Sequence, residues 1–350
     1  MKILVIGQSL VSRTEAVRDY LLNQGHSVSV IGLKSAFIKK RRKLLVFVFS
    51  FYIIKVIFSV LFFRKRFDLC IGVSHFSGMM GAVLTKLGIC KKSIYYCIDH
   101  YKGDGWLFTL QNAVDRWTVL HSDKVWDISD RIVEARKLDY RLYKNKHVIV
   151  PVGYGPTFFR YNEDIDRYSI VFVGVMQKGH GLELLPEILP SLIKVFPKIN
   201  IKVIGRGPFL DEFKIMVKER GLDEHFKIYG FIEDTDEMLD IIANSAIGLA
   251  LWSDIGNSYY GDSGKTKLYS VCGLPVVVSD FVIYSEAVTK CKAGIAIKYN
   301  KEVLIDAIIK LFSNDSLYWE YKSNAKLAAD AYCSSYKIFS DVLQGDGSNG

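Results

Sequence analysis

Residues 171–185 read VFVGVMQKGHGLELL, residues 203–232 read VIGRGPFLDEFKIMVKERGLDEHFKIYGFI, and residues 263–280 read SGKTKLYSVCGLPVVVSD. In each stretch a short apolar run lies next to a helical pattern, with glycine and polar residues between them. Short apolar strands that alternate with helices are typical of a parallel sheet covered by helices on both faces. We therefore predict an α/β fold whose polar loops follow the carboxyl ends of the strands.

The same alternation extends outward from these stretches over the chain. Six strands are predicted in the second half, at residues 168–174, 200–205, 225–230, 246–251, 274–279 and 293–297. Six more are predicted in the first half, at residues 2–7, 27–31, 68–73, 93–98, 124–129 and 147–152. We therefore predict two Rossmann-like, doubly wound domains that face a cleft.

A polar, turn-rich stretch at residues 153–164, GYGPTFFRYNED, separates the two series of strands. It places the first domain at residues 1–160 and the second at residues 161–325, with residues 326–350 as a terminal helix and a flexible tail. The chain has 350 residues, of which 50% are hydrophobic. That length is too great for one ordinary core, which agrees with two domains.

The cysteines and the N-terminus bear on the compartment. The six cysteines are scattered and form no CxxC pair, so the sequence offers no zinc site of the cysteine-pair kind. The N-terminal residues MKILVIG continue directly into a strand pattern rather than into a signal peptide. We therefore expect a protein of the reducing cytoplasm.

The net charge of +9 comes from one segment. Ten basic residues and no acidic residue lie between Lys34 and Arg66, whereas the rest of the chain has 36 basic and 37 acidic residues. The apolar run from Leu44 to Phe63 is long enough to cross a bilayer, but a crossing there would separate two strands of one sheet. An internal helix would leave the basic flanks unexplained. We therefore expect residues 39–66 to lie on an anionic membrane surface as an interfacial helix, and we expect no nucleic acid partner.

Cations follow the predicted strands of the second half. Lys178 comes after the first strand and Arg206 after the second. A turn before a helix adds a third cation and backbone N–H groups, with the residues Ser263, Gly264, Lys265 and Thr266. Cations and N–H groups at a helix start are what the charge of a diphosphate requires. Solvated loop charge is the alternative explanation for Lys178 and Arg206.

Taken in this order, the three stretches resemble the donor domain of GT-B glycosyltransferases, most of all the large retaining group 1 family that includes sucrose synthases and phosphatidylinositol mannosyltransferases. The resemblance implies an N-terminal domain that holds the acceptor and a C-terminal domain that binds a nucleotide-diphosphate sugar. In the family, the loop that is Gly230, Phe231 and Ile232 here presents its backbone to the nucleotide base. A plain turn at the end of a strand is the alternative.

Three positions depart from the pattern of the family. Val175 stands where the family usually has an arginine, which removes one cation from the phosphate site. Tyr260 and Leu268 stand where it usually has two glutamates, the second of which binds the donor ribose. Asp254 and Asp262 are nearby acids that could replace the missing carboxylates.

Two other nucleotide-binding motifs are excluded. The run GDSGKT is not a P-loop, because Tyr259 occupies the position of a required glycine. A nicotinamide cofactor is not expected, because no acidic residue ends the second strand. Gly7 instead begins a loop, GQSLVS, which resembles the short glycine loop of the family, where the backbone approaches the transferred group.

Three titratable residues follow strand ends in the first half and are the catalytic candidates. By register, His100 matches the loop histidine that lies beside the reacting sugar in mannosyltransferases of this family. Asp99 would be the general base of an inverting enzyme, and His75 is the third candidate. For each of them a structural role is the alternative.

These observations lead us to expect a hexosyltransferase, peripheral (monotopic) on the cytoplasmic face of the membrane. It would move a sugar from a nucleotide-diphosphate sugar to a polyprenyl-diphosphate-linked saccharide in surface polysaccharide biosynthesis. Retention of configuration is implied by the resemblance, and neither a cofactor nor a metal is expected. The alternatives are an inverting GT-B transferase with Asp99 as base, and a non-catalytic nucleotide-sugar-binding partner subunit, which the missing glutamates would explain.

Overall fold

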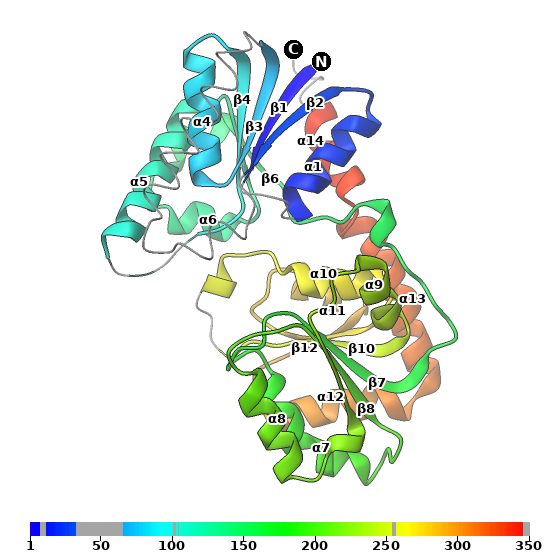
Figure 1. Cartoon of the computed structure of the whole chain (residues 1–350). Coiled ribbons are helices and arrows are strands. Elements are labelled where there is room, and N and C mark those ends of the chain that lie inside the picture. Colours follow the sequence, from blue (N-terminus) through cyan, green and yellow to red (C-terminus); the bar gives the residue numbers. More distant parts are fainter. Residues whose placement is uncertain (8–11, 33–65, 101–102, 104, 254–256, 346–350) are drawn as a thin grey trace. The chain divides into compact units, whose positions relative to one another are not determined.

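The computed structural model describes residues 1–7, 12–32, 66–100, 103, 105–253 and 257–345 (Figure 1). The chain divides into two compact units, one of Met1–Gly155 with Ser335–Gly350 and one of Pro156–Ser334. Within the described ranges, no helix is long and apolar enough to cross a membrane. The predicted interfacial segment, residues 39–66, lies outside the described residues except for Arg66.

The first unit is built on a parallel sheet whose described strands have the order β2-β1-β3-β4-β5-β6. These strands are β1 (Lys2–Gly7), β2 (Ser27–Gly32), β3 (Phe67–Val73), β4 (Cys90–Cys97), β5 (Lys124–Asp127) and β6 (His147–Ile149). The helices described with them are α1 (Ser12–Asn23), α4 (His75–Lys86), α5 (Trp106–His121), α6 (Asp130–Ala135) and α14 (Ser335–Gly345).

Strand β1 shows why this sequence forms a covered sheet. Its four apolar residues, Ile3 to Ile6, are all fully buried, as expected for a central parallel strand with helices on both faces. Leu4 and Ile6 pack with Met80 and Leu84 of α4. Figure 1 shows α4 and α5 on one face of the sheet and α1 and α14 on the other.

The second unit has a parallel sheet of the order β12-β11-β10-β7-β8-β9. Its strands are β7 (Asp166–Val173), β8 (Asn200–Ile204), β9 (Phe226–Gly230), β10 (Ser245–Ala250), β11 (Val276–Ser279) and β12 (Gly294–Ile297). Its α-helices in the described ranges are α7 (Leu185–Ile193), α8 (Leu210–Glu219), α9 (Thr235–Ala243), α10 (Gly264–Val271), α11 (Ser285–Lys290), α12 (Lys301–Ser313) and α13 (Asp315–Tyr332). The strand order reverses between β7 and β10, so the crevice beyond their carboxyl ends is where such sheets bind ligands.

The C-terminal residues differ from the expectation. We predicted a boundary at residue 160 and a separate terminal segment at residues 326–350. In the structure the chain passes from the first unit to the second after Gly155 and back to the first after Ser334. One helix, α13, continues to Tyr332 and belongs to the second unit. Helix α14 returns to the first unit, where Phe339 packs on Tyr20 and Trp126 with ring centroids 5.6 and 6.1 Å apart. The apolar pattern of the last helices does not indicate which unit they cover.

Candidate functional site

Three loops at the carboxyl edge of the second sheet are joined through their backbones. The N–H of Gly174, after β7, donates to Ile204 O, and the N–H of Gly205, after β8, donates to Gly230 O at 2.6 Å. Gly205 has a φ of +133°, and a Cβ added there would collide with the carbonyl oxygen of Gly174. Only glycine therefore lets these loops approach so closely.

Lys178 and Arg206 lie on these loops. The Lys178 Nζ is 2.6 Å from Glu212 Oε1, and both side chains are exposed. The Arg206 guanidinium lies 4.4 Å from the ring centroid of Phe231, in the loop after β9. An exposed ion pair and an exposed cation–π contact are each weak, so both cations can exchange their partners for a stronger anion.

Lys265 is the second residue of α10 and lies beside the end of β7. Its Nζ is 4.0 Å from the ring centroid of Trp252 and 4.8 Å from that of Phe172. Burial lowers the pKa of Lys265 to about 7, and the nearby carboxylate of Glu183 opposes this shift. The ammonium is thus held against aromatic faces, and an anion beside it would raise the pKa again.

A tyrosine hydroxyl attaches α10 to the place where β7 and β10 separate. The ladder between these strands runs as far as Val171 opposite Gly248. Beyond it, the buried Tyr269 hydroxyl accepts a hydrogen bond from Val173 N at 2.7 Å and donates one to Leu249 O at 3.1 Å. Both backbone groups are thus satisfied, and α10 is attached to the ends of both strands.

The turn before α10 is stabilised internally. The Ser263 side chain caps the helix by accepting from Thr266 N at 3.3 Å, and the Ser263 and Thr266 hydroxyls are 2.7 Å apart. Asp262 Oδ2 is 2.5 Å from Lys267 Nζ, with both side chains buried. Thr266 is fully buried and Asp262 pairs with Lys267, and the contact of either residue with a donor stays a prediction. Gly264 lies between the cap and Lys265.

The catalytic candidates of the first unit lie at the carboxyl ends of β3 and β4. His75 is the buried first residue of α4, and burial lowers the pKa of its imidazole, with Asp115 opposing the shift. His100 is half-buried, and burial lowers its pKa as well. The charge of His100 also lowers the pKa of His75. Asp99 is half-buried, and its backbone carbonyl accepts from the Cys97 thiol at 3.5 Å.

A buried charge network lies beneath these histidines. The Arg136 guanidinium donates to Asp115 Oδ2 at 2.7 Å and to Asp127 Oδ1 at 2.6 Å, and all three side chains are buried. His147 Nε2 lies 3.0 Å from Asp127 Oδ2. Burial alone would raise the pKa of Asp127, but Arg136 and His147 outweigh it and hold this pKa below its usual range.

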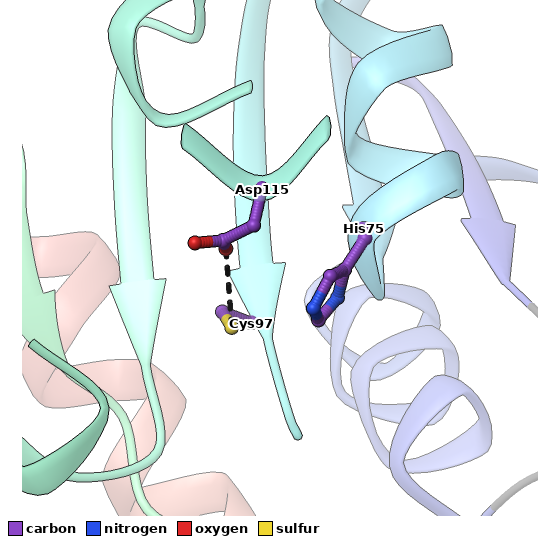
Figure 2. Close-up of side chains that lie close together, drawn as sticks. All are labelled: His75, Cys97 and Asp115. Atoms are coloured by element: carbon purple, nitrogen blue, oxygen red, sulfur yellow. Dashed lines mark hydrogen bonds between the residues drawn. The ribbon is translucent and has the colours of Figure 1, made fainter. Parts of the chain in front are cut away.

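His75, Cys97 and Asp115 form a cluster in which the atoms that could bind a metal all lie within 4.8 Å of one another (Figure 2). Asp115 already accepts hydrogen bonds from Tyr95 and Arg136, whose positive charge adjoins the cluster. Burial also raises the pKa of the Cys97 thiol, which disfavours the thiolate that metals bind. This donor set therefore fits a hydrogen-bond network better than a cation site.

A family model matches most of the second unit. The model of the Glycosyl transferases group 1 family matches residues 167–314, which contain the cationic loops described above. We call these matched residues the group 1 domain. The poly(glycerol-phosphate) alpha-glucosyltransferase of Bacillus subtilis (strain 168) is 21% identical over 174 residues, which are 49% of this chain and 24% of that protein. This chain thus spans about a quarter of that relative's length.

Solved structures establish the fold of the whole chain. Anabaena Alr3699/HepE in complex with UDP has a TM-score of 0.77 at 14% identity, covering 99% of this chain and 100% of that one. Its complex with UDP-glucose has a TM-score of 0.72 at the same identity and coverage. Sucrose-phosphate synthase from Thermosynechococcus elongatus has a TM-score of 0.75 at 15% identity, covering 99% and 98%. The chain therefore has the GT-B fold of two Rossmann-like α/β domains.

The departures from the family lie on the site loops of the group 1 domain. Val175 is exposed just after Gly174, so its side chain does not fill the core in place of a cation. Leu268 is buried within α10, whereas Tyr260 is half-buried with its ring edge-on to Tyr259 at 5.3 Å. Ile232 is half-buried next to the exposed Phe231.

Several residues of both units escaped the sequence analysis. In the group 1 domain they are Trp252, which Lys265 contacts, and Tyr269. Trp252 could have been found, because it follows a strand end as Lys178 does. Arg136 and its two carboxylates gave no such signal, because they come from two helix regions and a strand. Gly7 has a packing role, since a Cβ there would collide with Thr14, and its part in donor binding stays a prediction.

Proposed function

We propose that this protein is a hexosyltransferase that takes its sugar from a nucleotide-diphosphate donor. The observation that carries the proposal is the gathering of Lys178, Arg206 and Lys265 on joined loops beside the strand-order reversal. Among the described residues, Arg206 and Lys265 have no carboxylate within ion-pair distance. The binding of UDP and of UDP-glucose by HepE, which shares the fold, supports this use of the site.

The chemistry assigned to these residues is stabilisation of the leaving group. When the bond from the sugar to the diphosphate breaks, negative charge develops on the phosphate oxygen. Lys178 and Lys265 would stabilise that charge where it forms, and Arg206 with Phe231 and Ile232 would hold the nucleoside. In this proposal the cations of the chain do the work for which other transferases use a metal ion.

The acceptor belongs to the first unit in this proposal. It is a membrane-held saccharide, linked to polyprenyl diphosphate in surface polysaccharide biosynthesis, because the basic and apolar segment 39–66 lies in this part of the chain. His100 and His75 would contact the reacting groups, and transfer would retain the anomeric configuration. An inverting reaction with Asp99 as base is the alternative for the same site.

A second candidate function is a nucleotide-sugar-binding subunit without transfer activity. It is favoured by Tyr260 and Leu268, which replace the two glutamates of the family. Both candidates predict donor binding, and only the first predicts product.

Two measurements test the proposal. Heat unfolding with UDP should show stabilisation, by roughly 2.7 kcal/mol at a hundred times the dissociation constant. Labelled UDP-hexoses incubated with a lipid acceptor extract should then give a labelled lipid product, whose anomer separates retention from inversion. Stabilisation without product would favour the binding subunit, and neither effect with any nucleotide sugar would contradict both candidates.

A further inference from the structure

His180 lies next to Val175, the position at which the proposed phosphate site lacks the arginine of the family. Its Nδ1 is 3.2 Å from the carbonyl oxygen of Val175, the residue that replaces the expected arginine. A carbonyl oxygen only accepts hydrogen bonds, so in the neutral ring the proton is on Nδ1. The other nitrogen, Nε2, then has a lone pair, and it can bind an anion only after the ring takes up a second proton.

Trp252 brings His180 and Lys265 to one place. The His180 ring is edge-on to the Trp252 ring with centroids 6.3 Å apart, and the Lys265 Nζ lies 4.0 Å from the same ring. The loop that carries His180 is fixed there, because Ser253 N donates to Gly179 O at 2.7 Å. Gly179 has a φ of +82°, and a Cβ there would collide with Ser253 Oγ. The two titratable side chains thus face one aromatic ring from a loop and a helix start.

The described charges around His180 and Lys265 give neither group an anionic partner. Glu183 is the acid that acts on both, but its carboxylate accepts the N–H of Gly179 and forms no ion pair with either among the described residues. Tyr299 also interacts with Glu183, and burial raises the pKa of Tyr299 above the usual range, so it is neutral. Burial and the charge of Lys265 lower the pKa of His180. Lys178 and Arg206 on the neighbouring loops are themselves cations, so they offer no counter-charge to His180 and Lys265.

We propose that His180 and Lys265 together hold the diphosphate of the bound nucleotide sugar, each as a cation, and that each takes up its proton as the ligand binds. This inference rests on the proposed function and adds to it a binding residue, His180, and a proton linkage. In the unliganded protein near neutral pH, burial keeps His180 and part of the Lys265 population neutral. The diphosphate then supplies the counter-charge that favours protonation of both.

The linkage gives each group its own pH window. A group whose pKa rises on binding strengthens binding most below its unliganded pKa and loses this contribution as pH rises through the liganded one. For Lys265 the loss begins above about 7, and for His180 it begins lower, because its pKa is below that of an ordinary histidine. UDP affinity should therefore fall as pH rises through and above neutrality.

The test measures UDP binding to the full chain by calorimetry at pH about 6.5, 7.5 and 8.5, the range over which these groups titrate. Each variant is compared with the wild type at the same pH, so that the titration of UDP itself cancels. Lys265→Arg keeps its charge at every pH, so its affinity relative to the wild type should rise by up to about tenfold per pH unit above neutrality.

His180→Asn can still donate to the Val175 carbonyl, because the amide nitrogen of Asn takes the place of Nδ1, but it cannot become a cation. It should bind UDP several-fold more weakly than the wild type at the lowest pH and about equally at the highest. The matched control is His225→Asn, because His225 is also half-buried and its Nδ1 is 2.7 Å from a backbone carbonyl, that of Ile199, near the opposite edge of the sheet. This control should bind UDP as the wild type does at every pH.

Different results would overturn the proton linkage and the proposed function. If UDP binds to the wild type but both affinity ratios are independent of pH, the proton linkage is overturned and the proposed function stands. If UDP, GDP and the diphosphate sugars of uridine and guanosine do not bind at any pH, the proposed function is overturned and this inference with it. Heat unfolding of each variant checks that the fold is intact, and Lys265→Met serves as a second variant if Lys265→Arg unfolds.

Discussion

Arg136 keeps a full charge in the core because two carboxylates surround it. Its guanidinium reaches Asp115 and Asp127 at 2.7 and 2.6 Å, and these groups hold its pKa well above the usual range although burial acts against them. A buried pair of this kind adds little net stability, but removing one partner leaves an uncompensated charge. We therefore expect the network to hold the structure next to His75 and His100 in place rather than to contribute a large stabilisation.

Replacing Asp127 should have an effect that depends on pH. The carboxylate has a lowered pKa, so its stabilisation is complete above the unfolded value of about 3.9 and is lost as pH falls through the folded value. Asp127→Asn should cost about 3 to 5 kcal/mol near neutral pH, and the difference from the wild type should shrink below pH about 4. Denaturant unfolding at several pH values measures it, and a cost that is constant with pH would contradict the assignment.

Lys178 and Lys265 should matter for transfer much more than for folding. Each Lys→Ala change should remove about 2 to 4 kcal/mol of transition-state stabilisation, the range for a group aimed at developing charge. Lys178 is exposed, so its loss should leave the unfolding midpoint unchanged. Lys198→Ala is the control, since Lys198 is also exposed but precedes β8 at the amino edge of the sheet. Normal kcat/KM in both variants would remove these lysines from the site.

At the scale of elements, α10 is held by two contacts of its last turn and C-terminal end. The Tyr269 hydroxyl in the last turn bridges Val173 N and Leu249 O, and after that turn the buried Lys322 Nζ lies 3.3 Å from Gly273 O. Burial lowers the pKa of Lys322 to about 8, so much of its charge is present at neutral pH and favours the negative end of the helix dipole. This helix therefore presents Lys265 from a fixed position.

Tyr269→Phe should weaken both stability and donor binding. It leaves the N–H of Val173 buried without its partner, at a cost of about 1 to 3 kcal/mol, and releases α10 from the ends of β7 and β10. Tyr318→Phe is a matched control, because the Tyr318 hydroxyl is also buried and donates to Ala246 O. Ala246 lies at the amino end of β10, the strand that contains Leu249. Both variants should lower the unfolding midpoint, but only Tyr269→Phe should weaken UDP binding. Equal UDP affinity would show that α10 keeps its place without the hydroxyl.

The sequence was sufficient for most elements and for the cations that follow strands. The predicted first residues of β5 and β6 match the structure, because apolar periodicity and turn residues mark them locally. Lys178, Arg206 and Lys265 were found by the same local rule. The pairing of Asp262 with Lys267 was not predicted, since spacing alone cannot tell whether an acid near a helix start faces a ligand or the core. Tyr269 depends on the fork between β7 and β10, which exists only once the sheet has formed.

At the scale of the whole molecule, the first unit is completed by a helix from the other end of the chain. Phe339 is almost fully buried between Tyr20 and Trp126. Phe339→Ala should destabilise this unit by about 3 to 5 kcal/mol, whereas Leu327→Ala on the exposed face of α13 should change stability by less than about 0.5 kcal/mol. Hydrogen exchange should quicken in β1 and β5 and stay unchanged in β7. Faster exchange in both units alike would contradict an independent first unit.

The membrane partner is tested through the charge of the basic segment. Replacing Lys40, Arg41, Arg42 and Lys43 by glutamine should weaken binding to anionic vesicles, by on the order of 1 kcal/mol for each charge near the surface. UDP binding should not change, because these residues do not belong to the group 1 domain. Vesicle cosedimentation with and without anionic lipid, at low and high salt, measures the effect. Equal binding of the variant and the wild type would contradict an electrostatic attachment.

The return of α14 to the first unit has a consequence for synthesis on the ribosome. Residues Pro156–Ser334 form the second unit and are made between the two parts of the first. At the usual rates of translation this takes roughly 10 to 40 s, during which Tyr20 and Trp126 lack their covering ring. The nascent first unit must therefore wait with an apolar patch uncovered while the second folds, so chaperones are expected to bind it at that stage and to leave when residues 335–345 emerge.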